Sequence, residues 1–131
     1  MEKIKLSVTL PVEAKTLFKA WLNSKSHSAF TGGVAKVNSK IGGNYTAWDG
    51  YISGKNLELR ENQFIKQSWR TSEFAVDAED SILELSFKEK NGKTTLELYH
   101  YHLQPGDGKK YLDGWKEFYF EPMRSYFNKV S

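Results

Sequence analysis

The sequence predicts an α+β fold in which a curved antiparallel sheet of about six strands wraps around a long C-terminal helix, with two shorter helices after the first strand. Three observations predict it: an alternating stretch at the N-terminus, a central series of short stretches separated by turn residues, and a long amphipathic stretch at the C-terminus. The length of 131 residues suits one domain, residues 1–131. Sheet and helix would bury their apolar faces against each other.

The N-terminal part predicts a strand followed by two helices. Residues 3–10 alternate polar side chains with apolar ones, which are Ile4, Leu6, Val8 and Leu10. Pro11 suits a first helical turn, and apolar residues then recur at three- and four-residue spacing, namely Ala14, Leu17, Phe18, Trp21 and Leu22. The Ser-rich stretch over residues 23–33 ends in Gly32-Gly33 and predicts a short second helix.

The middle of the chain, residues 34–87, predicts an antiparallel meander of short strands. Turn residues separate the strands at 38–40, 42–43, 49–50, 54–56 and 61–62. Gly50 accepts the positive φ that a tight hairpin requires. Further strands are expected over residues 64–70 and 82–88, and Asn91-Gly92 turns the second of these into a strand over residues 94–103.

The last predicted strand carries histidines on its inner face. Leu96, Leu98, His100 and His102 share one face, so His100 faces the core if the leucines do. An inward imidazole could hydrogen-bond a ligand's carbonyl or act as a base, and the alternative is a core histidine satisfied by a neighbouring hydroxyl or water. His100 and His102 could also begin a zinc site, whose third ligand would come from elsewhere. We predict no metal, no cofactor and no catalytic residue, since no carboxylate is placed to orient the imidazole.

The C-terminal part predicts one long helix over residues 109 to about 129. Its wide apolar stripe consists of Leu112, Trp115, Phe118, Tyr119, Met123, Tyr126 and Phe127. Pro122 lies inside this stretch, removes one backbone donor and clashes with the carbonyl of Phe118. We therefore expect a kink or a short break near Pro122.

Composition limits the classes of function. Aromatic residues make up 15% of the chain, and large flat rings pack with gaps unless small residues lie between them, which hints at a pocket. The net charge is +3 with the lysines spread out, so we expect no nucleic-acid partner. The absence of cysteine excludes disulfides and thiolate chemistry. With no apolar run near the roughly 20 residues of a membrane span and no signal-peptide core, we expect a cytoplasmic protein without membrane insertion.

The element order and several motifs resemble the START-type helix-grip superfamily (START/SRPBCC), and within it the C-terminal domain of the activator of the heat-shock protein 90 ATPase. The motifs are Gly42-Gly43, Trp48-Asp49-Gly50 with Ile52 and Gly54, Ser68-Trp69-Arg70, Thr95-Leu96-Glu97-Leu98 leading into His100, and Gly114-Trp115 followed by Phe118-Tyr119-Phe120. The resemblance covers nearly the whole chain. It implies a cavity between sheet and helix, which relatives use for lipids, polyketides or other apolar molecules, or a domain that docks on the chaperone.

These observations predict a binding module rather than a catalyst. The candidate residues for the cavity wall are Tyr45, Trp48, Trp69, Leu98, His100, Trp115, Tyr119 and Met123. They would hold a small apolar or aromatic ligand, or they would simply fill the core. Two other functions stay open: a co-chaperone-like domain that interacts with a heat-shock protein 90 family chaperone, and a cyclase- or hydrolase-like enzyme as in distant helix-grip relatives.

Overall fold

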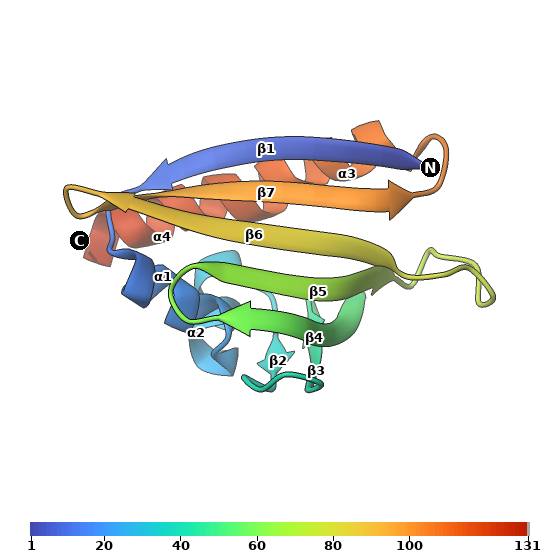
Figure 1. Ribbon diagram of the computed structural model, residues 1–131, viewed down its shortest axis with the longest axis horizontal. Helices are drawn as coiled ribbons and strands as arrows, with labels where there is room; N and C mark the ends of the chain where they lie inside the picture. The colour runs from blue at the N-terminus through green and yellow to red at the C-terminus, as the bar shows by residue number, and fades with distance from the viewer. Residues whose placement is uncertain (131) are drawn as a thin grey trace.

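An antiparallel sheet curves around the C-terminal helices in the computed structural model, which describes residues 1–130 (Figure 1). In this part of the chain seven strands pair in the order β1-β7-β6-β5-β4-β3-β2, so the first strand of the chain lies beside the last. Their bounds are β1 (Glu2–Leu10), β2 (Lys36–Val37), β3 (Asn44–Ala47), β4 (Ile52–Arg60), β5 (Phe64–Thr71), β6 (Ser81–Lys90) and β7 (Lys93–Leu103). The predicted α+β helix-grip fold is confirmed, with the two-residue β2 as an additional strand.

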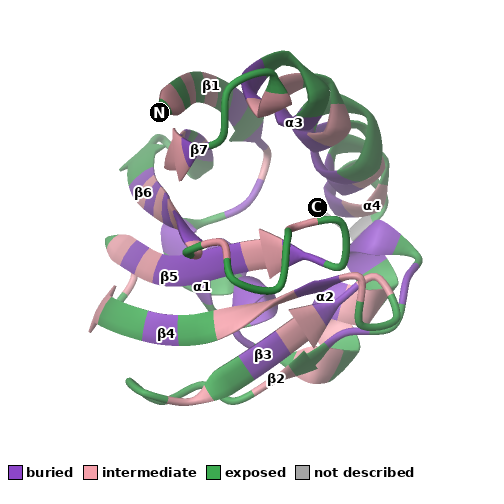
Figure 2. Cartoon of the chain, turned by 90° about the vertical axis from the view of Figure 1, so that its right-hand side faces the viewer, coloured by how far each residue is buried: buried purple, intermediate pink, exposed green. Residues whose placement is uncertain are grey.

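The helices cover the concave side of this sheet. Two short ones, α1 (Ala14–Trp21) and α2 (Ser24–Thr31), follow β1 as predicted. After β7 come α3 (Asp107–Trp115), the π-helical segment η1 (Lys116–Phe120) and α4 (Glu121–Val130). Seen from its end, the sheet forms an arc around α3 and α4, and buried residues alternate with less buried ones along its central strands (Figure 2). None of the helices formed by residues 1–130 has the length and apolar character of a membrane span.

The register of β6 and β7 follows the predicted alternation up to His100. Leu85 lies opposite Leu98, Leu83 lies opposite His100, and all four side chains are buried. The alternation then breaks, because His102 has a φ of 64° and Leu103 takes the buried position that a regular strand would give to His102. The predicted common inward face of His100 and His102 is therefore wrong for His102.

The turn predicted at residues 54–56 is also wrong, because β4 runs unbroken from Ile52 to Arg60. A Cβ built on Gly54 would lie 1.9 Å from the carbonyl oxygen of Ser68 on β5. The glycine thus allows two backbones to approach closely, and it does not mark a turn. Asn56, the other turn signal, is fully buried beside a register shift, where its amide donates to the carbonyls of Asn38 and Lys40.

The long C-terminal helix accommodates Pro122 by a change of helix type. The chain stays helical from α3 through η1 to α4, and the N–H of Glu121 donates to the carbonyl of Lys116, five residues earlier. In such a π-turn each N–H bonds the carbonyl five residues earlier instead of four, so the pairing of donors and acceptors shifts by one residue. The helix then does not require the N–H that Pro122 lacks. The expected break is thus a local widening of the helix directly before Pro122.

Glutamates from distant strands cap two helix N-termini. Glu89 Oε1 on β6 accepts a hydrogen bond from the N–H of Ala14 at 2.8 Å, at the start of α1. Glu2 on β1 accepts from the N–H groups of Gly106 and Gly108 at 2.9 and 2.7 Å, at the start of α3. These two donors hold the pKa of Glu2 below its usual value. Both caps satisfy helix N–H groups and tie the sheet to the helices.

Candidate functional site

A pocket lies between the sheet and the first half of the C-terminal helix. Its volume is about 490 Å³, within the range of roughly 300–1,000 Å³ that is usual for small-molecule sites. The wall is mainly aromatic and consists of Trp48, Tyr51, Ile52, Trp69, Glu73, Lys110, Tyr111, Gly114, Trp115, Phe118 and Tyr119. The residues come from the loop after β3, the sheet, the loop after β5, and α3 with η1.

The structure divides the eight predicted wall residues into two groups. Trp48, Trp69, Trp115 and Tyr119 line the pocket. The other four are buried in the surrounding core, and they are Tyr45, Leu98, His100 and Met123. The hydroxyl of Tyr45 donates to the carbonyl of Ser68 at 2.7 Å, which fixes its ring on the inner face of the sheet. Four of the eight candidates thus lie in the wall of this pocket, and the other four lie in the core around it.

His100 belongs to a chain of hydrogen bonds that holds two tryptophans of the wall. Trp115 Nε1–H donates to His100 Nδ1 at 3.0 Å, so the ring proton lies on Nε2 and is donated to Ser81 Oγ at 2.8 Å. The Ser81 hydroxyl donates in turn to the carbonyl of Trp69 at 2.6 Å. Burial lowers the pKa of His100 to about 3, so the ring is neutral at physiological pH. Both ring nitrogens are therefore engaged by the protein.

His27 plays the same part for Tyr119, from a position that the sequence pattern did not reveal. Its Nδ1–H donates to the carbonyl of Trp21 at 2.9 Å, and its Nε2 accepts from the hydroxyl of Tyr119, also at 2.9 Å. Burial lowers the pKa of His27 to about 4 and raises the pKa of Tyr119. A neutral histidine thus fixes Tyr119 in the wall.

The rings of the wall meet at steep angles and leave space between them. The ring centroids of Trp69 lie 5.0 Å from those of Tyr111 and 5.7 Å from those of Trp115, at interplanar angles of 79° and 40°. Gly114 faces this space, and the nearest atom to a Cβ built on it is Phe118 Cδ2 at 4.0 Å. Tilted rings and one residue without a side chain therefore keep the pocket open.

The mouth of the pocket carries a polar group of three residues, which we call the rim triad: Tyr51, Glu73 and Lys110. Glu73 accepts hydrogen bonds from the Tyr51 hydroxyl and from Lys110 Nζ, the latter at 2.6 Å. Lys110 and then Tyr51 hold the pKa of Glu73 below its usual value, and Glu73 raises the pKa of Lys110. Burial and the bond to Glu73 raise the pKa of Tyr51 to about 12. The triad is therefore an ion pair with a neutral phenol.

Trp48 lies in the loop after β3, in a conformation that is unusual for its residue type. It has a φ of 52°, and Asp49 and Gly50 follow with φ values of 59° and 90°. The predicted turn at residues 49–50 is confirmed, and it is pinned by the N–H of Asp49, which donates to the carbonyl of Val34 at 2.9 Å. The Trp48 ring packs edge-on against Phe118, with 5.8 Å between the centroids. Within residues 1–130 its buried Nε1 has no hydrogen-bond partner.

Comparison with known proteins identifies the family. The family model described as "Activator of Hsp90 ATPase homolog 1-like protein" matches residues 11–128. The chain belongs to this family. The activator of 90 kDa heat shock protein ATPase homolog 1 of Homo sapiens is 26% identical over 125 residues, which are 95% of this chain and 37% of the human protein. The chain therefore spans little more than a third of that relative.

Solved structures show the same fold as this family member. An HSP90 activator from Plasmodium falciparum superposes with a TM-score of 0.88 at 19% identity, covering 98% of this chain and 97% of the other. CalU16 from Micromonospora echinospora gives 0.80 at 19% identity, covering 95% and 73%. The Aha1 dimer from Colwellia psychrerythraea gives 0.79 at 9% identity, covering 97% and 96%. At these identities the likeness concerns the fold alone.

The two buried histidines and the glutamate at the pocket are all bonded to other residues of the chain. His27 and His100 are neutral and engaged on both nitrogens, and the carboxylate of Glu73 is paired with Lys110. His102 lies near the surface, where its Nε2 bonds Glu79 at 2.8 Å, so it does not converge with His100. Among the described residues no group of three His, Asp or Glu side chains is arranged to hold a metal ion.

Apart from Ile52 at the start of β4, the wall residues that sequence reasoning missed fall into two kinds. Tyr111 precedes Trp115 by four residues and Phe118 follows it by three, while Gly114 lies three residues after Tyr111 and four before Phe118, so a helical projection would have found all three. Tyr51, Glu73 and Lys110 meet only through the tertiary fold, because two of them lie in loops without periodicity. Their pairing had no signal in the sequence.

Proposed function

We propose that this chain is a non-enzymatic binding module that holds a small apolar or aromatic ligand in the pocket between the sheet and α3 with η1. The observation that carries the proposal is the pocket of about 490 Å³ with its largely aromatic wall. Apolar walls with a few placed polar groups are how small-molecule sites are generally built. The hydrogen bonds that Tyr119 and Trp115 donate to His27 and His100 support the proposal because they hold these wall residues in place and leave the interior open.

A nuclear magnetic resonance titration tests this proposal. The ¹⁵N-labelled protein is titrated with flavonoid-like aromatics and with single-chain lipids, and saturable shifts are expected at Trp69, Tyr111 and Trp115. The matched control is Gly114→Leu, whose side chain would enter the pocket from α3. We expect this variant to fold and to lose the shifts. Shifts that persist in Gly114→Leu, or that gather away from the wall, would contradict the proposal.

The family and its relatives favour a second candidate, a co-chaperone-like domain that interacts with a heat-shock protein 90 family chaperone in the cytoplasm. Its support is the description of the family and the names of the human and Plasmodium proteins. Because the chain spans 37% of the human relative, the whole activity of that relative does not carry over by length alone. Calorimetric titration with the purified chaperone decides between the candidates, since binding unaffected by Gly114→Leu would place the contact on the surface.

A further inference from the structure

The polar groups of the pocket wall differ in whether a ligand can still bond to them. On the inner wall, Trp115, Tyr119 and Tyr111 each use their polar group on another side chain of the protein. Glu73 and Lys110 lie at the mouth of the same pocket, where their side chains are 50% and 45% exposed. A ligand whose body fills the pocket therefore meets accessible polar atoms at the mouth.

The ion pair of the rim triad keeps unused hydrogen-bonding capacity on both of its members. The ammonium of Lys110 has three donors, and within residues 1–130 it makes one hydrogen bond, to Glu73 Oε1 at 2.6 Å. The Glu73 carboxylate accepts that bond and one from the Tyr51 hydroxyl, so roughly half of its lone-pair sites stay open. The rim triad therefore offers a ligand a donor and an acceptor side by side.

Glu73 is held at the mouth by the contacts of its own loop. The N–H of Ser72 donates to the carbonyl of Tyr51 at 2.9 Å, and the N–H of Glu73 donates to Thr71 Oγ1 at 3.2 Å. The ring of the next residue, Phe74, packs against two rings of the pocket wall, with 6.2 Å between the centroids in both contacts. The carboxylate is therefore preorganised beside the pocket, which lowers the entropic cost of binding a ligand.

The opposite charges of the ion pair disfavour a ligand whose polar end is ionised. A ligand carboxylate would be attracted by Lys110 and repelled by the adjacent carboxylate of Glu73, and a ligand ammonium group would meet the reverse. In both cases the two effects largely cancel. The cost of removing the ion from water remains, because the rest of the wall is mainly aromatic. An uncharged group that donates to Glu73 and accepts from Lys110 avoids this cost.

We propose that the ligand of this pocket is an uncharged aromatic compound with a hydroxyl group at one end, and that this hydroxyl bonds Glu73 and Lys110 at the mouth. The inference rests on the proposed binding function and names the class of ligand. A hydroxyl donates and accepts through one atom, so it suits a donor and an acceptor that lie 2.6 Å apart. The aromatic body lies inward, among Trp69 and Trp115, and the ion pair at the mouth determines specificity.

Four compounds with one bicyclic body test the inference: naphthalene, 2-naphthol, 2-naphthoate and 2-naphthylmethylammonium. We expect 2-naphthol to bind about three- to tenfold more tightly than naphthalene, which is the effect of about one net hydrogen bond. Both ions are expected to bind more weakly than 2-naphthol. Titration of the ¹⁵N-labelled protein at neutral pH gives the dissociation constants, and shifts at Trp69 and Trp115 show that the compounds occupy the pocket.

Charge variants of the ion pair test whether the polar end of the ligand reaches it. Glu73→Gln removes the repulsion and should shift the ratio of affinities towards 2-naphthoate by about three- to tenfold. Lys110→Gln should shift the ratio towards 2-naphthylmethylammonium to a similar extent. The matched controls, Asp77→Asn and Lys109→Gln, change the same charges in the same loop and helix but lie outside the pocket wall. They should leave the ratios unchanged.

The outcomes distinguish this inference from the proposed function. Equal affinity for naphthalene and 2-naphthol would overturn the inference and leave the pocket proposal standing, as would tighter binding of either ion to the unchanged protein. Ratios that stay the same in Glu73→Gln and Lys110→Gln would also overturn it. If a variant fails to fold, the four affinities of the unchanged protein decide alone. Binding of none of the compounds at the pocket wall would overturn both proposals.

Discussion

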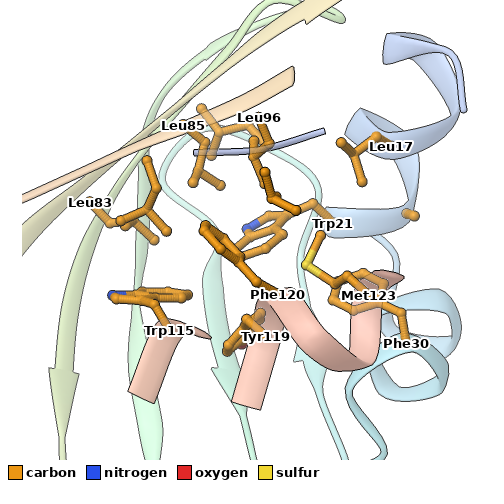
Figure 3. Close-up of a cluster of buried hydrophobic side chains, with 14 of the residues drawn as sticks. Leu17, Trp21, Phe30, Leu83, Leu85, Leu96, Trp115, Tyr119, Phe120 and Met123 are labelled. Atoms are coloured by element: carbon orange, nitrogen blue, oxygen red, sulfur yellow. The ribbon is translucent and has the colours of Figure 1, made fainter. Parts of the chain in front are cut away.

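The two halves of the C-terminal helix face the same sheet but pack against it differently. In the second half, Phe120, Met123 and Phe127 are at most 3% exposed. Phe120 and Met123 pack among Leu17, Trp21, Phe30, Leu85 and Leu96 (Figure 3), and the ring centroid of Phe127 lies 5.9 Å from that of Phe30. In the first half, α3 and the start of η1 leave a pocket of about 490 Å³, and Phe118 stays 51% exposed. One half of the helix is closed core and the other is an open site.

The difference lies in which side chains meet and what holds them. Beside α4, aromatic rings are interleaved with Leu17, Leu85, Leu96 and Met123, whose flexible side chains adapt to the rings and fill the space between them. Around α3 the side chains are large rings, and two of them are held by hydrogen bonds: Trp115 by His100 and Tyr119 by His27. A ring that is fixed by a buried hydrogen bond cannot tilt into a neighbouring gap without losing that bond. The pocket is therefore maintained by polar groups in the core behind it.

The largest effect that separates the two halves is expected from Met123→Ala. Met123 is fully buried, so its truncation removes packing and leaves a cavity that costs about 2–5 kcal/mol of the free energy of unfolding. Phe118→Ala on the same helix is the control, because a half-exposed side chain is expected to change stability by less than about 1 kcal/mol while weakening ligand binding. Urea unfolding measures the stability of both variants, and titration with the flavonoid-like aromatics measures their ligand binding. Equal losses of stability in the two variants would show that the halves are packed alike.

The buried histidines are expected to make stability depend on pH. Their pKa values in the folded protein, about 4 for His27 and about 3 for His100, lie below the usual 6.5. Below pH 6.5 the unfolded chain binds protons that the folded protein does not, so the free energy of unfolding falls as the pH falls from 6.5 towards 4. The lowered pKa of His27 corresponds to up to about 3 kcal/mol over this interval. Denaturant unfolding at a series of pH values measures the slope.

The variant His27→Asn assigns its share of that slope. Asparagine can still donate to the carbonyl of Trp21 and does not titrate, so the pH dependence between 6.5 and 4 should become shallower although the protein is less stable throughout. A slope unchanged by this substitution would mean that His27 is not the neutral ring that the bonds to Trp21 and Tyr119 require.

The sequence predicted the parts of the molecule in which periodicity decides the outcome. Alternation placed Leu83, Leu85, Leu96 and Leu98 in the core, and the aromatic residues of the helical stripe led to the pocket wall at Trp115 and Tyr119. Local patterns misled where glycine or asparagine serves a tertiary purpose, as in β4 at Gly54 and Asn56. His102 does not lie on the predicted inner face of β7, because its positive φ breaks the alternation of the strand.

Other features had no local signal because their partners are far apart in the chain. His27 acts through Tyr119, 92 residues away, and the rim triad joins two loops to α3. The N-terminal caps of α1 and α3 likewise depend on Glu89 and Glu2, which the sequence pattern does not distinguish from other polar residues of strands. Periodicity reports which face of an element is apolar, whereas these contacts depend on how the elements are placed relative to one another.

A smaller effect is expected from Gly114→Ala in the open half. Gly114 lies in a helix with room beside it, and alanine there should raise the free energy of unfolding by about 0.5–1 kcal/mol while it narrows the pocket and weakens ligand binding. Gly54→Ala is the matched control, since its Cβ would meet the carbonyl oxygen of Ser68 and should destabilise the protein. Thermal unfolding measures the stability of both variants, and titration with the flavonoid-like aromatics measures their ligand binding. A loss of stability in Gly114→Ala would show that the space beside α3 is already filled.

The smallest effect is expected where the pocket half begins, at the cap on α3. Glu2→Gln removes the charge that accepts from Gly106 and Gly108, so the melting temperature should fall slightly at neutral pH, and the Gly108 amide should exchange hydrogen faster. Because the pKa of Glu2 is lowered in the folded protein, its contribution is present above the usual glutamate pKa and is lost as the pH falls through the lowered one. The difference between the two proteins should therefore vanish in acid and shrink in high salt, since the carboxylate is exposed. A difference that survived both would mean that Glu2 acts through packing against α3, and the open half would then depend on β1 for its shape as well as for its charge.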